Sequence, residues 1–515
     1  MTTTTTTTAA ANGHAHAHHS HHNGASHTHH HHHHGPLTEK HLNPAIVSAS
    51  YAVRGPLATK AEQYRAHIKA KGDAHQLPFK SVVTANIGNP QQQGLDQPPI
   101  TFFRQVAALT EYPPLVDDPR AEALFPADVR ARARELLQEV GSTGAYSHSQ
   151  GVPAIRQHVA DFITARDNLP PELASKPENI FLTAGASQGV SLILQILSTK
   201  QTGILIPIPQ YPLYTATLAA LDTNALPYHL NEGDDWGLDP ASVEQAIADA
   251  HEKGISPRAL VVINPGNPTG SVLHKPVMKA ILDICAKNHL VLLADEVYQV
   301  NIHDPTREWV SFSSLARKEP SDPKMAIVSF HSISKGVAGE CGRRGGYFEL
   351  LNFPPEVTAQ IYKMASVGLC PPVQGQIAVD CLVRPPKQGD PSWELYEQES
   401  TAIARALKER TETMVSRLNA LEGISCQPSS GALYVYPQLF LPPRAVEEAK
   451  KHKQEADEYY AECLLDQTGI CVTPGSGFGQ KEGEAHIRLT VLCPGVDEYV
   501  GRIERFHRAF MQKWA

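Results

Sequence analysis

Four short apolar runs between residues 180 and 350 constrain the fold more than any other feature of the chain. The runs occupy residues 203–206, 259–263, 290–294 and 325–330. Continuous apolar runs of this length indicate strands that are buried on both faces, as in a parallel sheet covered by helices. Helical patterns separate the runs, so the sequence predicts an α/β fold with a mostly parallel sheet between helices.

A cluster of polar residues follows each apolar run. The clusters contain Tyr211, Asn267, Asp295 with Tyr298, and Lys335. Because ligands of open α/β sheets bind at the carboxyl ends of the strands, we expect these side chains to meet in one crevice.

The chain is too long, at 515 residues, for a single hydrophobic core, so we expect more than one domain. Residues 1–35 form a tail rich in threonine and histidine that cannot build a core and is expected to be disordered. Residues 36–105 form an N-terminal arm that contributes to the small domain, and 106–375 form the large domain. Residues 376–515, which contain a long charged helix around 402–420, form the rest of a smaller α+β domain.

Composition excludes several classes of function. A net charge of −8 offers no broad attraction for nucleic acid, and no apolar stretch is long enough to span a membrane. The eight cysteines are scattered and indicate a reducing compartment. The tail contains no Lys or Arg before Lys40 and no apolar segment, so a cytoplasmic location is expected. Its histidines are typical of a tag or a low-complexity tail, and no metal site is predicted.

The polar clusters offer the groups that an aldehyde-bearing, phosphorylated pyridine cofactor needs. Lys335 can form a Schiff base with the aldehyde, although a lone lysine is more often a solvated surface group. Ser332, Ser334 and an arginine in the glycine-rich stretch that follows can bind the phosphate, with Arg344 favoured and Arg343 as its competitor. The helix that opens at Ala186 and Ser187 can direct its amides at the same anion, although Ser187 can equally be a simple helix cap.

The remaining demands of such a cofactor also have candidates. Asp295 can keep the pyridine nitrogen protonated, while Tyr298 and Asn267 can donate to the ring oxygen. Tyr211 can stack on the ring face, although an aromatic residue beside prolines is frequently only packing. Arg488 can bind a substrate carboxylate through its forked guanidinium, with an ordinary surface arginine as the alternative.

These residues resemble the fold type I aminotransferases that depend on pyridoxal phosphate, and within them the alanine aminotransferase branch. The resemblance covers nearly everything after residue 40. It rests on Asn267-Pro-Thr-Gly270, the Asp295 to Tyr298 spacing, Ser332-Ile-Ser-Lys335, and on the longer strings Tyr51-Ala-Val-Arg-Gly-Pro56, Ala85-Asn-Ile-Gly88, Gly144-Ala-Tyr-Ser-His-Ser-Gln-Gly151, Ile208-Pro-Gln-Tyr-Pro-Leu-Tyr214, Gly339-Glu-Cys-Gly-Arg-Arg-Gly-Gly-Tyr347 and Pro474-Gly-Ser-Gly-Phe-Gly479.

The resemblance implies a large domain with a seven-stranded sheet, a small domain built from both ends of the chain, and a homodimer. Tyr146 matches the tyrosine that reaches the neighbouring subunit's cofactor phosphate, and Gly88 matches a backbone position near the substrate. The arginine directly before the paired glycines favours Arg344 over Arg343. The last residues of the segment Tyr298-Gln-Val-Asn-Ile-His303 depart from the usual continuation of the branch, which affects substrate detail and not the use of the cofactor.

The expected reaction is a ping-pong transfer in which L-alanine and 2-oxoglutarate give pyruvate and L-glutamate, with Lys335 holding the cofactor as an aldimine. Three alternatives remain open. The first is a glutamate:glyoxylate or broader-specificity aminotransferase, and the second is a related lyase that acts on S-adenosylmethionine. The third is a cofactor-binding regulator, which would need a basic DNA-reading module that the tail does not offer.

Overall fold

A computed structural model describes residues 37–49, 51, 55–321 and 324–515. The expected disordered tail at 1–35 lies outside the described residues. The chain divides into two units, residues 1–44 and 45–515. The described part of the first unit contains the 3₁₀ turn Glu39–His41 and the start of α1, Pro44–Ser48. The second unit contains the rest of the described chain.

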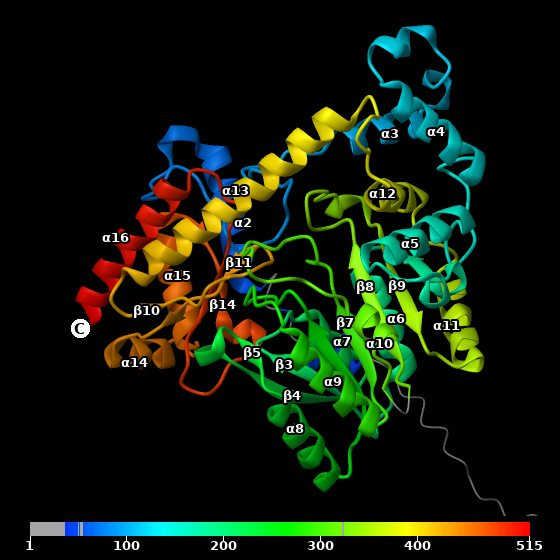
Figure 1. The fold of residues 1–515 in the computed structure, drawn as a ribbon. Coiled ribbons are helices and arrows are strands. Elements are labelled where there is room, and N and C mark those ends of the chain that lie inside the picture. The colour runs from blue at the N-terminus through cyan, green and yellow to red at the C-terminus, as the bar shows by residue number, and fades with distance from the viewer. Residues whose placement is uncertain (1–36, 50, 52–54, 322–323) are drawn as a thin grey trace, which may run out of the picture. The chain divides into compact units, whose positions relative to one another are not determined.

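An eight-stranded sheet forms the centre of this unit, with strand order β2-β9-β8-β7-β6-β3-β4-β5 (Figure 1). Its strands are β2 Ile180–Thr183, β3 Thr202–Ile208, β4 Asn224–Asn231, β5 Gly237–Leu238, β6 Ser256–Ile263, β7 Val291–Asp295, β8 Ile327–Ser332 and β9 Gly346–Leu351. The pairs β3–β4, β3–β6, β6–β7 and β7–β8 are parallel, while β9 runs antiparallel to both of its neighbours and β5 runs antiparallel to β4. The predicted mostly parallel sheet is therefore confirmed.

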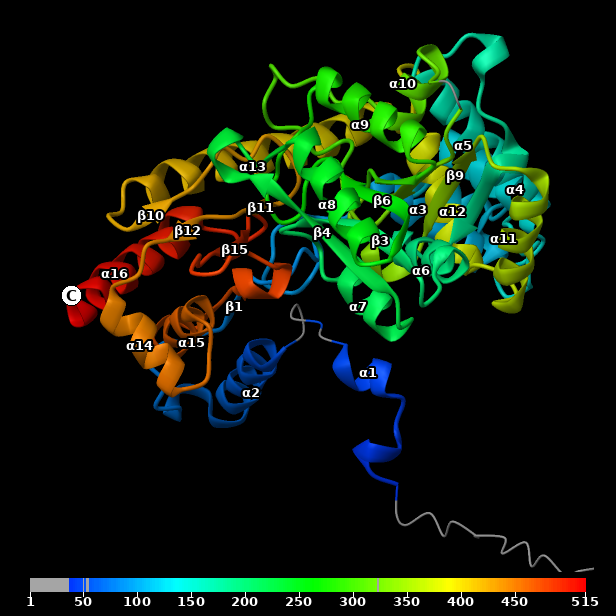
Figure 2. The same cartoon turned by 90° about the horizontal axis from the view of Figure 1, so that it is seen from below.

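Helices cover both faces of the sheet (Figure 2). On one face pack α6 Ala186–Leu197, α7 Leu213–Ala220 and α11 Pro355–Val367. On the other face pack α8 Pro240–Glu252, α9 Lys275–Lys287 and α10 Phe312–Lys318. Burial on both faces explains why the strands are continuous apolar runs, since neither side of the sheet meets water.

Side chains alternate between the two faces of the sheet along β7, and this alternation determines where Asp295 points. Leu292 and Ala294 belong to the core on the α8, α9 and α10 side, while Leu293 belongs to the core on the α6, α7 and α11 side. Asp295 follows in the same alternation and points to the same face as Leu293, where Tyr214 of α7 contacts it. The alternation therefore turns the last side chain of the strand toward α7.

A further helical layer packs beside β2 and β9. It consists of α3 Thr101–Glu111, α4 Ala127–Val140, α5 Pro153–Arg166 and α12 Val373–Val383. Pro126 precedes α4, Asp128 lies in its first turn, and Gly141 ends it in a left-handed conformation with φ 71°. A proline and an acidic residue at the start and a glycine at the end are typical boundaries of a helix.

The C-terminal part of the chain forms three small sheets with helices around them. Its strands are β10 Ile424–Ser425, β11 Tyr434–Val435, β12 Gln438–Leu439, β13 Ile470–Cys471, β14 Thr473–Pro474 and β15 Ile487–Thr490, and its helices are α13 Trp393–Asn419, α14 Pro443–Lys451, α15 Ala456–Thr468 and α16 Val496–Trp514. The sheets are β10–β12, β11–β15–β14 and a pair that β13 forms with the early strand β1, Val83–Thr84.

Segments from the N-terminal region pack into this C-terminal part. Strand β1 pairs in parallel with β13, and helix α2, Pro56–Lys71, lies against α15. Lys60 of α2 is ion-paired with Glu462 and Asp466 of α15 at 2.7 Å each. The predicted smaller α+β part that combines both ends of the chain is confirmed.

Two details differ from the sequence-based expectation. The sheet has eight strands instead of seven, because residues 232–236 turn the chain back and add the two-residue strand β5 at its edge. Two residues are too short to produce a recognisable pattern. The long charged helix begins at Trp393, earlier than predicted, and its buried residues Ile403, Leu407, Thr411, Met414 and Leu418 follow the helical spacing.

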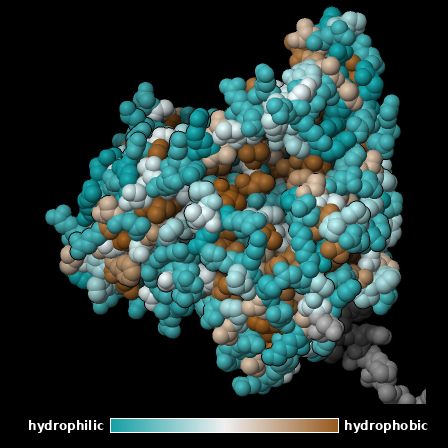
Figure 3. Space-filling model, in the orientation of Figure 1, coloured by the Kyte–Doolittle hydropathy of each residue, from teal (hydrophilic) through white to brown (hydrophobic). Residues whose placement is uncertain are grey.

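The face in Figure 3 is mostly hydrophilic, with hydrophobic residues gathered toward its middle. Among the described residues, no helix combines the length and the apolar character that crossing a membrane requires.

We predict that Leu293→Ala lowers the free energy of unfolding by about 2–5 kcal/mol, because it leaves a cavity in a fully buried strand that positions Asp295. Chemical denaturation monitored by circular dichroism measures the change. Leu395→Ala is the matched control, because Leu395 of α13 is 46% exposed and its truncation is expected to cost less than about 0.5 kcal/mol. Equal effects of the two substitutions would contradict the assigned core.

Candidate active site

A cavity of about 470 Å³ opens at the carboxyl ends of β6, β7 and β8. Twelve of the thirteen residues singled out from the sequence line it: Gly88, Ala186, Ser187, Tyr211, Asn267, Asp295, Tyr298, Ser332, Ser334, Lys335, Arg344 and Arg488. The expectation that the polar clusters after the strands meet in one crevice is confirmed.

Asp295 is the buried carboxylate of the cavity, with 6% of its surface exposed. Tyr214 donates a hydrogen bond of 2.8 Å to Oδ2, whereas Oδ1 is buried and has no hydrogen-bond partner in the described part of the chain. Burial raises the pKa of this carboxyl above its ordinary value, against the opposing effects of Tyr214, the Val297 amide and the Lys335 charge. One carboxylate oxygen is thus held by the protein, and the other is left for a donor that enters the cavity.

Lys335 lies in the loop directly after β8. Its Nζ donates a hydrogen bond to the backbone oxygen of Gly88 and lies 5.9 Å from the centre of the Tyr298 ring. The amine is therefore held at a defined place in the cavity.

An anion-binding end lies where α6 begins. Arg344 donates from Nη2 to Ser187 Oγ at 3.2 Å and to the Ala184 carbonyl at 2.9 Å. Gly185, with φ 78°, leaves the space for this guanidinium, because a Cβ at that position would overlap it. The first amides of α6 point toward the same end, so positive charge and N–H donors converge there.

Arg343 has a different environment from Arg344. Its Nε donates to the buried carboxylate of Glu340 at 3.1 Å, and it does not line the cavity. The geometry therefore agrees with the preference for Arg344.

Arg488 enters the cavity from β15 and is almost completely buried, with 1% of its surface exposed. It donates to Asn267 Oδ1 at 3.0 Å and to the Asn86 carbonyl at 2.6 Å. Its guanidinium carbon lies between the rings of Tyr434 and Phe478, at 4.1 and 4.7 Å from their centres. Its Nε is buried without a hydrogen-bond partner among the described residues, so a donor remains for an anion.

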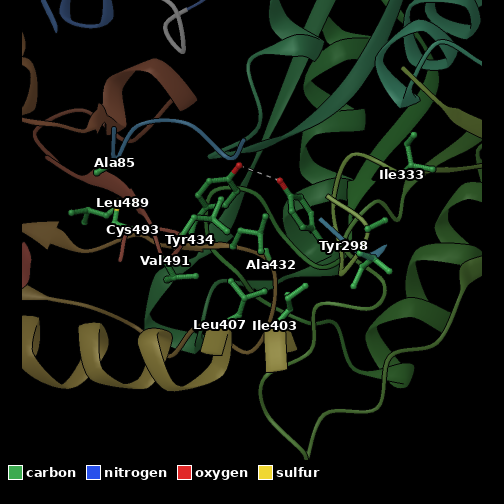
Figure 4. Packing of buried hydrophobic residues seen from close by; sticks show 14 of the residues in the cluster. Ala85, Tyr298, Ile333, Ile403, Leu407, Ala432, Tyr434, Leu489, Val491 and Cys493 are labelled. Atoms are coloured by element: carbon green, nitrogen blue, oxygen red, sulfur yellow. Dashed lines mark hydrogen bonds between the residues drawn. The ribbon is translucent and has the colours of Figure 1, made fainter. Parts of the chain in front are cut away.

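The two tyrosines nearest to Lys335 contact each other. Tyr298 donates to the Tyr434 hydroxyl at 3.3 Å, as the dashed line in Figure 4 marks. Burial raises the pKa of Tyr298 well above its ordinary value. Burial acts in the same direction on Tyr434, but the charges of Lys335 and Arg488 outweigh it, so the pKa of Tyr434 is lowered.

Tyr146 does not join the cavity in the single chain. It is 79% exposed and lies in the segment between α4 and α5. Tyr211, in contrast, lines the cavity, and its hydroxyl lies 2.7 Å from that of Tyr51.

A second polar group lies outside the cavity. Ligand-type atoms of Glu232, Glu484 and His486 lie within 4.8 Å of one another. His486 Nε2 is 3.0 Å from Glu232, and its Nδ1 is 3.0 Å from Gln480. The contact between His486 and Glu232 joins the start of β15 to the turn after β4.

Residues 114–503 match the family model of class I and II aminotransferases. The chain belongs to this family. It is 48% identical to a probable mitochondrial alanine aminotransferase of Dictyostelium discoideum, over 91% of this chain and 88% of that protein. The mitochondrial alanine aminotransferase 1 of Arabidopsis thaliana is 44% identical, over 93% and 88%. Glutamate–glyoxylate aminotransferase 1 of the same plant is 43% identical, over 92% and 96%.

A solved alanine aminotransferase from Pyrococcus furiosus has the same fold as this aminotransferase. The TM-score is 0.71 at 22% sequence identity, and the match covers 92% of this chain and all of that one. The resemblance to fold type I aminotransferases that the sequence motifs indicated is confirmed.

The expected cytoplasmic location of this aminotransferase is wrong. The names of the Dictyostelium protein and of the first Arabidopsis protein both include the word mitochondrial. The expectation rested on a missing pattern in the first thirty-five residues, and a missing targeting pattern says little about the compartment.

The sequence analysis of this aminotransferase overlooked Tyr214 and Tyr434 as members of the site. Tyr214 lies three residues after Tyr211, a spacing that brings side chains to one side of a helical turn. Tyr434 lies in an apolar stretch that resembles an ordinary core strand. Only its cross-strand neighbour Thr490, two residues from Arg488, indicates that it faces the cavity.

We predict that Asp295→Asn raises the melting temperature of the ligand-free aminotransferase at pH 8 by about 2 °C or more, because the substitution removes an uncompensated buried charge. The sign follows from the raised pKa: the cost of burying the ionisable group is present in full above its folded-state pKa and is lost as the pH falls below that value toward the unfolded pKa. The gain must therefore shrink as the pH falls toward about 4, where the unfolded carboxyl is also protonated.

Differential scanning calorimetry at pH 8 and pH 5 measures this effect. Asp283→Asn, at an exposed position of α9, is the matched control and is expected to change little at either pH. A variant of Asp295 that melts below the unchanged protein at pH 8 would contradict the assignment of Oδ1 as an unpartnered charge.

Proposed function

We propose that this aminotransferase binds pyridoxal 5′-phosphate in the cavity and transfers the amino group of L-alanine to 2-oxoglutarate, giving pyruvate and L-glutamate. The observation that carries the proposal is the buried Oδ1 of Asp295, which lacks a partner among the described residues and belongs to the same cavity as Lys335 and Arg488. The alanine aminotransferases of Dictyostelium and Arabidopsis, at 48% and 44% identity, support the choice of substrate.

The cavity fits the phosphate at the end where α6 begins. Arg344 supplies a permanent positive charge there, and Ser187, Ser332 and Ser334 supply hydroxyl groups. The amides of Ala186 and Ser187 at the start of α6 can donate to the same oxygens. These groups would hold the phosphate without a metal ion.

The cavity fits the pyridine ring between the anion-binding end and Asp295. Oδ1 of Asp295 would accept a hydrogen bond from a protonated ring nitrogen, which removes the cost of its burial. Tyr298 and Asn267 would donate to the ring oxygen, and Tyr211 would cover a ring face. When bound, pyridoxal phosphate supplies an electron-accepting ring that stabilises negative charge at the substrate's α-carbon.

Two residues act on the substrate itself. Arg488 would bind the α-carboxylate, because its buried guanidinium has an unpartnered Nε and a planar array of donors. Lys335 would hold the cofactor aldehyde and then, once the amino acid has taken its place, accept and return the α-proton at Nζ. Gly88 lines the same cavity, and its carbonyl oxygen accepts a hydrogen bond from Nζ.

We also propose that the active form is a homodimer and that Tyr146 reaches the phosphate of the partner subunit. The exposure of Tyr146 and its place outside the cavity of its own chain support this role. The division of the chain at about residues 105 and 375 into a small N-terminal part, a large cofactor-binding domain and a C-terminal domain is part of the same proposal.

Glutamate:glyoxylate transfer is the second candidate function, because the second Arabidopsis relative carries that name at 43% identity. Steady-state kinetics with pyruvate, glyoxylate and aromatic oxo acids as acceptors distinguish the two candidates. The proposed alanine activity requires the highest kcat/KM for pyruvate when glutamate is the donor.

Absorbance spectra of the purified holoenzyme test the proposal directly. We expect the visible band of bound pyridoxal phosphate to be replaced by a band at shorter wavelength when alanine is added, and to return when 2-oxoglutarate follows. Lys335→Ala is expected to lower the turnover by a factor of at least about 10² because it removes the proton-transferring amine. Lys287→Ala, at a lysine whose side chain is 73% exposed, is the control and should behave like the unchanged protein.

A comparison of two neighbouring arginines tests the phosphate site. We predict that Arg344→Gln raises the dissociation constant of pyridoxal phosphate by about tenfold or more, since a charge-assisted contact is worth about 1.5–3 kcal/mol. Arg343→Gln should change the constant by less than about threefold, because Arg343 pairs with Glu340 outside the cavity. Fluorescence titration of the apoenzyme measures both, and a larger effect at Arg343 would reverse the assignment.

A further inference from the structure

The hydroxyl group of Tyr434 lies where the main components of the cavity meet. Its side chain is buried, with 3% exposed, and projects from β11 toward Tyr298 (Figure 4). The oxygen accepts a hydrogen bond from Tyr298 at 3.3 Å, and the Lys335 amine is close enough to lower the pKa of the phenol by its charge and as a donor. Two donors therefore face one phenol oxygen.

The ring of the same side chain supports Arg488. The guanidinium carbon of Arg488 lies 4.1 Å from the centre of the Tyr434 ring, and Phe478 covers the guanidinium at 4.7 Å. Two aromatic faces thus hold the cation in place, and a desolvated cation–π contact of this kind is worth about 2 kcal/mol. Tyr434 consequently touches the arginine proposed to bind the carboxylate and the lysine proposed to carry the proton.

The backbone is shaped around this hydroxyl. A Cβ at position 88 would overlap the Tyr434 oxygen and would come within 3.1 Å of Lys335 Nζ. The absence of a side chain at Gly88 lets its carbonyl oxygen and the Tyr434 oxygen both contact Nζ. The amine is therefore held between two oxygen acceptors.

We infer that Tyr434 is a further catalytic residue, whose hydroxyl shares a proton with the Lys335 amine while its ring positions Arg488. In one state the amine is an ammonium and the phenol a phenolate. In the other, the N–H bond has broken, the O–H bond has formed, and Nζ carries a free electron pair that can accept the substrate's α-proton. The proton count and the total charge of the pair are the same in both states.

The electrostatics of the cavity supports this inference. Burial disfavours a phenolate, but the neighbouring charges of Lys335 and Arg488 and the two hydrogen bonds favour it more, so the pKa of Tyr434 is lowered. Tyr298 has a raised pKa and remains protonated, so its one O–H can serve Tyr434 in the empty cavity and the ring oxygen when the cofactor is bound. The two tyrosines are thus suited to opposite roles.

Substitution of Tyr434 by phenylalanine tests the inference, which rests on the proposed function. A pH titration of the bound cofactor's absorbance, without substrate, reports the protonation of its linkage to Lys335. We expect the midpoint to fall by about one pH unit in Tyr434→Phe, because an acceptor for the protonated nitrogen is lost. We expect kcat for alanine to fall about tenfold or more, with KM changed less than about threefold because the ring remains beneath Arg488.

Two further variants separate the hydroxyl from the ring and from general disturbance. Tyr434→Leu removes both, so it should also raise KM for alanine by about thirtyfold, the equivalent of the lost cation–π contact. Tyr436→Phe is the matched control, because Tyr436 is buried two residues away against Trp236 and His486 and does not line the cavity. Its titration midpoint and kcat should equal those of the unchanged enzyme.

The outcomes distinguish this inference from the function on which it rests. If the unchanged enzyme binds no pyridoxal phosphate, or if its spectrum does not change when alanine is added, both the proposed function and the role of Tyr434 are overturned. An unchanged enzyme that responds normally, together with a Tyr434→Phe variant whose midpoint and kcat match those of Tyr436→Phe, overturns only the role of Tyr434. Circular dichroism of every variant identifies any substitution that fails to fold. If Tyr434→Phe fails to fold, Tyr434→His replaces it, because histidine keeps a ring and a polar atom. Its titration midpoint must then lie between those of Tyr434→Leu and the unchanged enzyme.

Discussion

The parallel register of β6, β7 and β8 determines which side chains can meet in the cavity. Ile263 pairs with Asp295, and Asp295 pairs with Phe330, so the three strands end nearly level with one another. The loops that follow them deliver Asn267, Tyr298 and Lys335 to one edge of the sheet. A shift of one residue in any of these pairings would turn Asp295 into the opposite core and separate it from Tyr214.

Within the cavity, charges are buried in excess of the partners that the protein supplies. Asp295 has one oxygen without a donor, and Arg488 has one donor without an acceptor, among the described residues. Buried polar groups of this kind cost free energy unless something satisfies them. A ligand with a protonated ring nitrogen near Asp295 and a carboxylate near Arg488 would recover this free energy on binding. The groups that destabilise the empty cavity therefore also determine which ligand binds there.

The fold and most of the site could be predicted from the sequence because each depends on local patterns. The apolar runs mark strands that are buried on both faces. The polar residues directly after these strands lie at the edge of the sheet where the strands end. The preference for Arg344 over Arg343 rested on neighbouring glycines, and Gly185 does make room for the Arg344 guanidinium. Tyr434 could not be found in this way, since its role depends on β11 pairing with β15 from a distant part of the chain. Strand β5 was missed because a two-residue edge strand carries no periodicity. The compartment was misjudged because the expectation rested on a pattern that was absent.

The pairing of β1 with β13 has a consequence for how the chain acquires its fold during synthesis. Residues 83 and 84 leave the ribosome early, but their partners at 470 and 471 follow only after the whole eight-stranded sheet has been made. Domains generally fold in the order in which they emerge, so the central sheet can assemble before β1 and α2 have their partners β13 and α15. The N-terminal segment therefore cannot take its place against α15 and β13 until that late part of the chain has emerged.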